Sequence, residues 1–193
     1  MIYLSIEKRK AIFLDRDGTI NIDKEYLYKI EDFEFEPKAC EALKILSDLG
    51  YLLIIVTNQS GVARGYYKEE DVELLHRDLL QILLEKGIKI SKVYYCPHHP
   101  TKGIGKYKID CDCRKPSPGM ILNGIKDFNI DPSLSYMIGD KKSDVEAGIR
   151  ACVSSVFLNN GKEKIDNNFP QDVLIFNSLY DFAIFLKKQS KKY

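Results

Sequence analysis

The sequence contains no apolar stretch that approaches the ~20 residues a membrane-spanning helix requires. Its first ten residues, MIYLSIEKRK, lack the long apolar core and the small-residue cleavage site of a secretory signal. It also lacks a basic excess: Lys and Arg number 29, Asp and Glu number 28, and the formal net charge is +1. General binders of nucleic acids or membrane surfaces normally carry such an excess. We therefore expect a cytoplasmic protein with neither kind of partner.

Cysteine is scarce, and its placement does not indicate a disulfide framework. Only five of the 193 residues are cysteines, and a reducing compartment disfavours disulfides. The composition is otherwise ordinary for a globular domain, with 45% hydrophobic and 30% charged residues. A chain of this length can bury one sizeable core without cross-links. We expect a single domain over residues 1–193 and, because no coiled-coil heptad is present, a monomer.

Short apolar segments alternate with amphipathic ones along the chain. Periodicity predicts helices between the apolar segments, at residues 37–49, 68–86, 117–128, 143–151 and 180–188, with Pro37 as the first helical residue. The apolar segments themselves read as buried strands at residues 11–14, 51–56, 93–95, 136–138, 153–158 and 173–176. This alternation predicts an α/β fold: a doubly wound, mostly parallel, Rossmann-like sheet covered by helices on both faces.

Polar segments follow the ends of the expected strands, where a doubly wound fold binds its ligands. Each segment taken alone also fits a turn, a helix cap or a surface loop. Four of them in order, three directly after strands and one closing a long loop, favour a shared function instead. They are Asp15-Arg16-Asp17-Gly18-Thr19, Thr57-Asn58-Gln59-Ser60, Arg114-Lys115-Pro116 and Gly139-Asp140-Lys141.

The residue types in these segments suit the cleavage of a phosphate ester. A carboxylate can act as nucleophile through an acyl phosphate, while charge on the phosphoryl oxygens is neutralised. Asp15 and Asp140 can hold a Mg²⁺ ion that cancels the repulsion between carboxylate and phosphate. Lys115 and the Thr57 hydroxyl would then bind the remaining phosphoryl oxygens. Asp17, two positions after Asp15, suits a general acid that later acts as a base.

Four motifs in this order, FLDRDGTIN, TNQSG, CRKP and GDKKSD, resemble those of the haloacid dehalogenase-like phosphatases. The resemblance implies Asp15 as nucleophile, Asp17 as acid and base, and Thr57 with Lys115 as phosphoryl stabilisers. It also implies that Mg²⁺ is bound by Asp15, by Asp140 and by the backbone carbonyl of Asp17. Asp144 corresponds to an outer acidic residue that orients its neighbours.

A second motif, C-x-H-x₁₂-C-x-C, is formed by Cys96, His98, Cys111 and Cys113. Three thiolates and an imidazole suit tetrahedral Zn²⁺, and four protein ligands indicate a structural site. A redox-active or incidental cysteine cluster is the alternative, and His99 could replace His98 as a ligand. Because Arg114 and Lys115 directly follow the last cysteine, zinc would also position these two cations.

The pairing of FLDRDGTIN with the cysteine-histidine motif resembles a narrower branch, the heptose bisphosphate and histidinol-phosphate phosphatases. That branch implies a sugar bisphosphate substrate and a reaction on the route to nucleotide-activated heptose for lipopolysaccharide. It also implies that Arg114 is the cation that recognises the substrate. The intervals after the first two strands are too short for a large cap domain. The resemblance implies substrate contacts by Asp23, Lys24, Glu25, Tyr26, Thr57, Asn58, Gln59, Ser60, Arg114, Lys115 and Lys141.

Three other functions remain open at the level of sequence. Histidinol-phosphate phosphatase shares nearly every motif, and polynucleotide 3′-phosphatases share the Asp-x-Asp-Gly-Thr chemistry. A zinc-stabilised binding module without activity is the alternative of another class, although its site residues would be hard to explain. His76, on an exposed-looking expected helix that also carries Glu73 and Arg77, receives no role.

Overall fold

The computed structural model describes residues 8–161, 165 and 169–191, so part of the segment MIYLSIEKRK lies outside it. Within this part, six strands form one parallel sheet in the order β3-β2-β1-β4-β5-β6. The doubly wound α/β fold is therefore confirmed. The strands are β1 (Ala11–Leu14), β2 (Leu52–Asn58), β3 (Ile90–Cys96), β4 (Tyr136–Gly139), β5 (Ser154–Leu158) and β6 (Leu174–Phe176).

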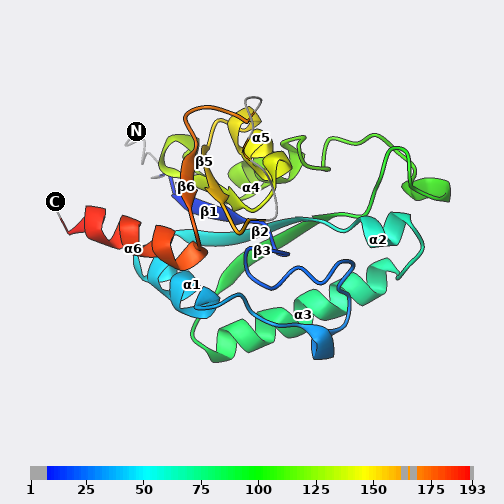
Figure 1. Cartoon of the computed structure of the whole chain (residues 1–193), viewed down its shortest axis with the longest axis horizontal. Coiled ribbons are helices and arrows are strands. Elements are labelled where there is room, and N and C mark those ends of the chain that lie inside the picture. Colours follow the sequence, from blue (N-terminus) through cyan, green and yellow to red (C-terminus); the bar gives the residue numbers. More distant parts are fainter. Residues whose placement is uncertain (1–7, 162–164, 166–168, 192–193) are drawn as a thin grey trace, which may run out of the picture.

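Helices cover both faces of the sheet (Figure 1). The helices are α1 (Ala39–Asp48), α2 (Ser60–Ala63), α3 (Glu69–Glu85), α4 (Gly119–Phe128), α5 (Lys142–Arg150) and α6 (Leu179–Ser190). Three single turns of 3-10 helix lie in the connections between strands and helices: η1 (Ile30–Asp32), η2 (Gly105–Tyr107) and η3 (Pro132–Leu134). Helices α1, α3 and α6 pack on one face, and α4 and α5 pack on the other. Among these described helices, none is long and apolar enough to cross a membrane.

All six expected strands are present, but one local expectation was wrong and one short helix was missed. Pro37 is not the first helical residue, because Lys38 adopts a left-handed conformation with φ of 60° and α1 begins at Ala39. Helix α2 was not expected, since four residues are too few to show helical periodicity. No large cap domain interrupts the described residues, in agreement with the short intervals after β1 and β2.

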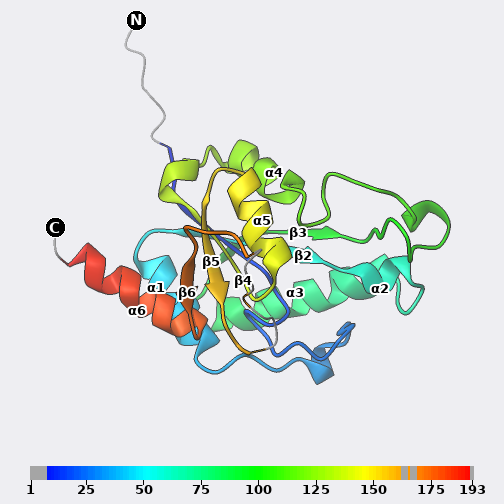
Figure 2. The same ribbon diagram turned by 45° about the horizontal axis from the view of Figure 1, so that its top comes forward.

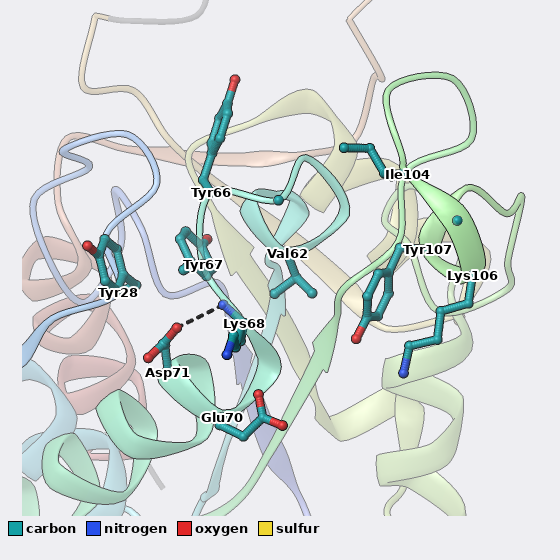
Figure 3. A pocket seen from close by; sticks show the side chains of 12 residues that line it. Tyr28, Val62, Tyr66, Tyr67, Lys68, Glu70, Asp71, Ile104, Lys106 and Tyr107 are labelled. Atoms are coloured by element: carbon teal, nitrogen blue, oxygen red, sulfur yellow. Dashed lines mark hydrogen bonds between the residues drawn. The ribbon is translucent and has the colours of Figure 1, made fainter.

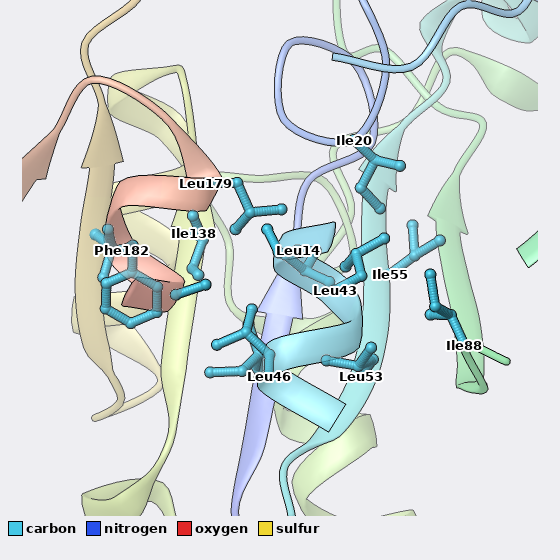
Figure 4. Packing of buried hydrophobic residues seen from close by; sticks show 14 of the residues in the cluster. Leu14, Ile20, Leu43, Leu46, Leu53, Ile55, Ile88, Ile138, Leu179 and Phe182 are labelled. Atoms are coloured by element: carbon cyan, nitrogen blue, oxygen red, sulfur yellow. The ribbon is translucent and has the colours of Figure 1, made fainter. Parts of the chain in front are cut away.

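The larger of the hydrophobic clusters lies between the sheet and the helices α1, α3 and α6 (Figure 4). Leu43 and Leu46 of α1 meet Leu53 of β2 there, and Phe182 of α6 packs beside them. All four side chains are at most 1% exposed. Burial of the apolar face of α1 against the sheet thus fixes the position of the segment that precedes it, residues 21–38.

The strand order places a topological switch point between β1 and β4. The chain proceeds from β1 outward to β2 and β3, then returns to add β4 on the opposite side of β1. The backbone N–H of Asp15 donates to the carbonyl of Ile138 at 2.9 Å, so the carboxyl ends of these strands are adjacent. In open α/β sheets, ligands bind in the crevice at such a point.

Candidate active site

A buried lysine joins two carboxylates at the switch point. The Nζ atom of Lys115 lies 2.8 Å from Oδ1 of Asp15 and 2.7 Å from Oδ1 of Asp144, and it donates to the Val56 carbonyl at 2.8 Å. Burial raises the pKa of Asp15 to about 6, against the opposing effect of Lys115. Burial would lower the pKa of Lys115, but Asp144 and Asp15 outweigh it and the pKa lies above its usual value. The ammonium group therefore stays charged in this site.

The carboxylate of Asp140 lies beside this group and suits a divalent cation. Its Oδ1 atom is buried without a hydrogen-bond partner among the described residues, while Oδ2 accepts from the amide of Asn160 at 3.0 Å. Burial, and then the charge of Asp15, raises the pKa of Asp140 to about 6. Carboxylate oxygens of Asp15, Asp140 and Asp144 lie within 4.8 Å of one another. Crowded buried oxygens of this kind fit a hard cation such as Mg²⁺.

Gly18 allows the turn after β1 to approach Asp140 closely. Its φ is +81°, and a Cβ atom on it would lie 2.1 Å from Oδ2 of Asp140. A side chain at this position would therefore meet both a backbone penalty and a clash with the carboxylate.

Asp17 is held by donors from three side chains. The Arg16 guanidinium reaches its two oxygens at 3.0 and 2.9 Å, Asn21 donates at 2.9 Å, and Gln59 donates at 3.1 Å. Burial would raise the pKa of Asp17, but Arg16 and the two amides outweigh it and hold the pKa below its usual value. In this arrangement Asp17 is ionised at neutral pH.

The segment after β2 supplies a second set of fixed polar groups. The amide of Gln59 also donates to the Thr57 hydroxyl at 2.9 Å, and the Tyr67 hydroxyl donates to Gln59 at 3.0 Å. Asn58 makes two bonds to the backbone of Lys115, at 3.0 and 3.1 Å. These bonds connect the end of β2 to the cation that lies between the carboxylates.

A polar cleft of about 300 Å³ opens above these groups. Lys141, on its wall, bonds to Asp23 at 3.0 Å and so joins the segment after β1 to the end of β4. Lys24 is directed elsewhere, since its Nζ atom donates to the Asp32 carbonyl at 2.9 Å and pairs with Glu34 at 3.1 Å. The cleft is lined by Asp17, Asp23, Glu25, Tyr26, Asn58, Gln59, Ser60, Tyr67 and Lys141.

A larger groove of about 740 Å³ adjoins the cleft along Tyr67 (Figure 3). Val62 lies between Tyr67 and Tyr107 in this groove, and Asp71 accepts from the backbone N–H of Lys68 at 2.8 Å. Its lining contains none of Asp15, Asp17 and Asp140, whereas Asp17 lines the smaller cleft.

Four residues of the cysteine-histidine motif converge beside the cleft. Sulfur atoms of Cys96 and Cys111 are 3.5 Å apart, those of Cys111 and Cys113 are 3.2 Å apart, and His98 Nδ1 is 3.6 Å from Cys113 and 3.9 Å from Cys96. Tetrahedral zinc ligands at ~2.0–2.3 Å from the ion have similar separations, so the cluster fits Zn²⁺. His99 lies outside the cluster, and its Nδ1 accepts from the backbone N–H of Lys102 at 3.0 Å.

The loop that carries this cluster lies beside α2 in both views of the ribbon (Figures 1 and 2). The N–H of Ile104 donates to the Ala63 carbonyl at 2.9 Å, and the Tyr107 hydroxyl donates to Glu69 at 2.7 Å. At the end of the loop, Arg114 donates to the carbonyl of His98 at 3.1 Å. The loop thus holds Arg114 at the edge of the site.

This chain is similar to several known proteins. The D-glycero-beta-D-manno-heptose-1,7-bisphosphate 7-phosphatase of Pasteurella multocida (strain Pm70) is 46% identical over 180 residues, which cover 93% of this chain and 97% of that protein. The chain belongs to the heptose bisphosphate phosphatase family. A D-glycero-alpha-D-manno-heptose-1,7-bisphosphate 7-phosphatase of Photorhabdus laumondii subsp. laumondii is 49% identical over 151 residues, 78% of this chain and 82% of that protein.

The fold of this family agrees with the strand order found here. A D,D-heptose 1,7-bisphosphate phosphatase from B. bronchiseptica, solved with magnesium and phosphate, superimposes with a TM-score of 0.82 at 27% identity, covering 93% of this chain and 99% of that one. A family model described as HAD-hydrolase-like matches residues 112–182. The resemblance to haloacid dehalogenase-like phosphatases is therefore confirmed, as is the expectation of a phosphatase.

Sequence analysis missed several residues that shape the site. Arg16 is fully buried and binds Asp17, and the Tyr67 hydroxyl donates to Gln59. The expectation that His76 is exposed was wrong, because only 5% of it is accessible and its Nε2 lies 3.1 Å from the Arg16 guanidinium. A signal was available: His76 is four positions after Val72 and three before Leu79, on the apolar stripe of α3.

We expect the protein to lose stability in mild acid because of the buried, neutral His76. Burial, and then the charge of Arg16, lowers the pKa of His76 to about 3, so the unfolded state binds a proton that the folded state does not. Its stabilising effect is complete above the unfolded pKa of ~6.5 and is lost as the pH falls from there toward 3. When the pH falls from 7 to 5, the free energy of unfolding measured with urea should decrease by about 2 kcal/mol more for the wild type than for His76→Gln. Equal losses would contradict the buried neutral imidazole.

Proposed function

We propose that this chain removes the 7-phosphate from D-glycero-beta-D-manno-heptose 1,7-bisphosphate, in a route toward nucleotide-activated heptose for lipopolysaccharide. The observation that carries the proposal is the group of Asp15, Lys115 and Asp140 at the switch point, in a chain nearly half identical to a phosphatase of that name over almost its full length. The P. laumondii relative named for the alpha anomer matches over a smaller share of the chain.

Asp15 is the nucleophile in this proposal, and Lys115 and Thr57 stabilise the phosphoryl group. A carboxylate oxygen of Asp15 attacks phosphorus and forms an acyl phosphate as the bond to the sugar oxygen breaks. Lys115, which contacts Asp15 in the free site, then binds a phosphoryl oxygen, and the Thr57 hydroxyl binds another. Water attacks phosphorus in the second step and restores the carboxylate.

Asp17 transfers the protons in both steps. It gives a proton to the departing sugar oxygen and later accepts one from the attacking water. Because Arg16, Asn21 and Gln59 hold it ionised in the free site, it acquires the proton with the substrate, whose phosphate monoester is partly protonated near neutral pH.

Magnesium would be held by Asp15, Asp140 and the backbone carbonyl of Asp17, and it would supply the positive charge that lets one anion approach another. Oδ1 of Asp140, which has no hydrogen-bond partner in the part of the chain that the structure describes, supports this assignment. Zinc would be held by Cys96, His98, Cys111 and Cys113 and would fix the shape of the loop.

Two cations at the edge of the site suit the second phosphate of a bisphosphate. Arg114 presents a planar guanidinium that can bind phosphate through two hydrogen bonds. Burial would lower the pKa of Lys141, but Asp15, Asp140 and Asp23 outweigh it and keep the amine charged. A monophosphate such as histidinol phosphate would leave this part of the site without its anion.

Steady-state kinetics with Mg²⁺ on the heptose bisphosphate and on histidinol phosphate tests the substrate. We expect kcat/KM to favour the bisphosphate by roughly 10- to 100-fold, the value of one or two charged hydrogen bonds. Arg114→Ala should reduce this preference, whereas Lys106→Ala, on the exposed part of the same loop, should not.

A preference for histidinol phosphate would overturn the assignment. Failure to hydrolyse any ester in a broad panel would indicate the zinc-stabilised binding module instead.

Zinc removal should impair the enzyme without unfolding it. We expect one zinc per chain by metal analysis, and loss of zinc in Cys111→Ser but not in Cys40→Ser, which lies outside the cluster. Displacement of Arg114 and Lys115 by about 1 Å should lower kcat/KM by roughly tenfold or more, while circular dichroism retains the signal of the sheet and helices. Full activity of a verified zinc-free enzyme would refute the role of the loop.

A further inference from the structure

Arg16 is a buried cation whose hydrogen bonds run in three directions. Its side chain has no exposed surface, and its NH2 group donates to both oxygens of Asp17, at 3.0 and 2.9 Å. The same NH2 group lies 3.1 Å from the carbonyl of Leu27, in the segment that carries the cleft residues after β1. The NH1 group lies 3.1 Å from Nε2 of His76 on α3. The guanidinium thus contacts the site, the segment beside it and a helix of the core.

The direction of the bond between Arg16 and His76 follows from their chemistry. A guanidinium only donates hydrogen bonds, so Nε2 of His76 must be the acceptor and the ring hydrogen must lie on Nδ1. A protonated imidazole could not accept this bond, and its charge would be repelled by Arg16. The low pKa of His76 agrees with a neutral ring.

Tyr95 of β3 packs beside the imidazole of His76, which α3 carries. The centroids of the two rings are 5.8 Å apart, and the Tyr95 hydroxyl lies 3.1 Å from a carboxylate oxygen of Glu69 and 3.1 Å from one of Glu73, both on α3. Because the acceptor is fixed and the guanidinium is planar, the bond at NH1 determines how the opposite edge of Arg16 faces Asp17. Without that acceptor, a buried N–H group would lack a partner and the guanidinium would rotate toward another one.

We propose that His76 is a positioning residue for catalysis, which acts through Arg16 to hold the carboxyl group of Asp17 in line with the departing oxygen. The inference rests on the proposed function, in which Asp17 delivers the proton. His76 lies outside the lining of the cleft and outside both groups of residues that fit a metal ion. Its contribution comes from the hydrogen bond that it accepts, so a side chain that supplies an oxygen at the same place should replace it.

The nature of the leaving group separates this role from a merely structural one. An alkyl phosphate needs a proton on its departing oxygen, whereas p-nitrophenyl phosphate releases a stable anion and hardly needs one. The ratio kcat/KM reports the first phosphoryl transfer for both substrates. Misplacement of Asp17 therefore lowers kcat/KM for the alkyl ester selectively, while a general distortion of the site lowers both.

The experiment compares His76→Leu, which removes the acceptor, with His76→Gln, which restores one. Arg77→Gln, an exposed neighbour on the same helix, is the matched control. We expect His76→Leu to lose about tenfold in kcat/KM for an alkyl monophosphate, part of the ~10²–10⁴ that a general acid supplies, and less than about twofold for p-nitrophenyl phosphate. His76→Gln should stay within about threefold of the wild type on both, and Arg77→Gln should be unchanged.

Two further variants keep the test decisive. Arg16→Lys retains the charge but not the planar fork, so it should show the same selective loss. It therefore serves as the test variant if His76→Leu does not fold. Asp17→Asn tests the premise: if it shows no selectivity between the two esters, the proposed role of Asp17 fails and the inference fails with it. If Asp17→Asn is selective but the His76 and Arg16 variants lose activity equally on both esters, or on neither, only the inference is overturned.

Discussion

The contact of Lys115 with Asp15 and Asp144 is the interaction on which the rest of the site depends. Buried charges are costly unless they are paired, and here one ammonium group faces two carboxylates in a region that is almost fully inaccessible. Removal of Lys115 would leave two like charges facing each other beside Asp140. The position of Lys115 is therefore closely constrained, by the Val56 carbonyl on β2 and by Asn58 at its end.

Two structural features place these charged side chains next to one another. The reversal of strand order between β1 and β4 makes the carboxyl ends of these strands adjacent, which brings Asp15 and Asp140 together. Lys115, two residues after Cys113, lies at the end of the loop with the cysteine-histidine cluster and contacts Asp15 and Asp144. The same loop ending carries Arg114, so the geometry of the loop bears on both phosphoryl binding and substrate selection in the proposed function.

Much of the fold could be predicted from the sequence, because each strand is a short apolar run and parallel strands gather their carboxyl ends at one edge. The same reasoning placed Asp15, Thr57 and Asp140 together, although their chemical roles stay a proposal. The connection between Arg16 and His76 was missed, since their hydrogen bond links residues 60 positions apart and no local pattern encodes it. The turn before α1 was also missed: Lys38 adopts a left-handed conformation that composition does not reveal.

The proposed mechanism requires a carboxylate of this chain to become esterified to phosphorus during turnover. The most direct measurement is to quench the enzyme in acid within its first turnover, reduce any acyl phosphate with borohydride, and sequence the peptides by mass spectrometry. We expect homoserine in place of Asp15, at a level that rises and falls with turnover, and none in Asp15→Asn. An unmodified Asp15 in an enzyme that hydrolyses its substrate at the normal rate, or a label on another residue, would contradict it.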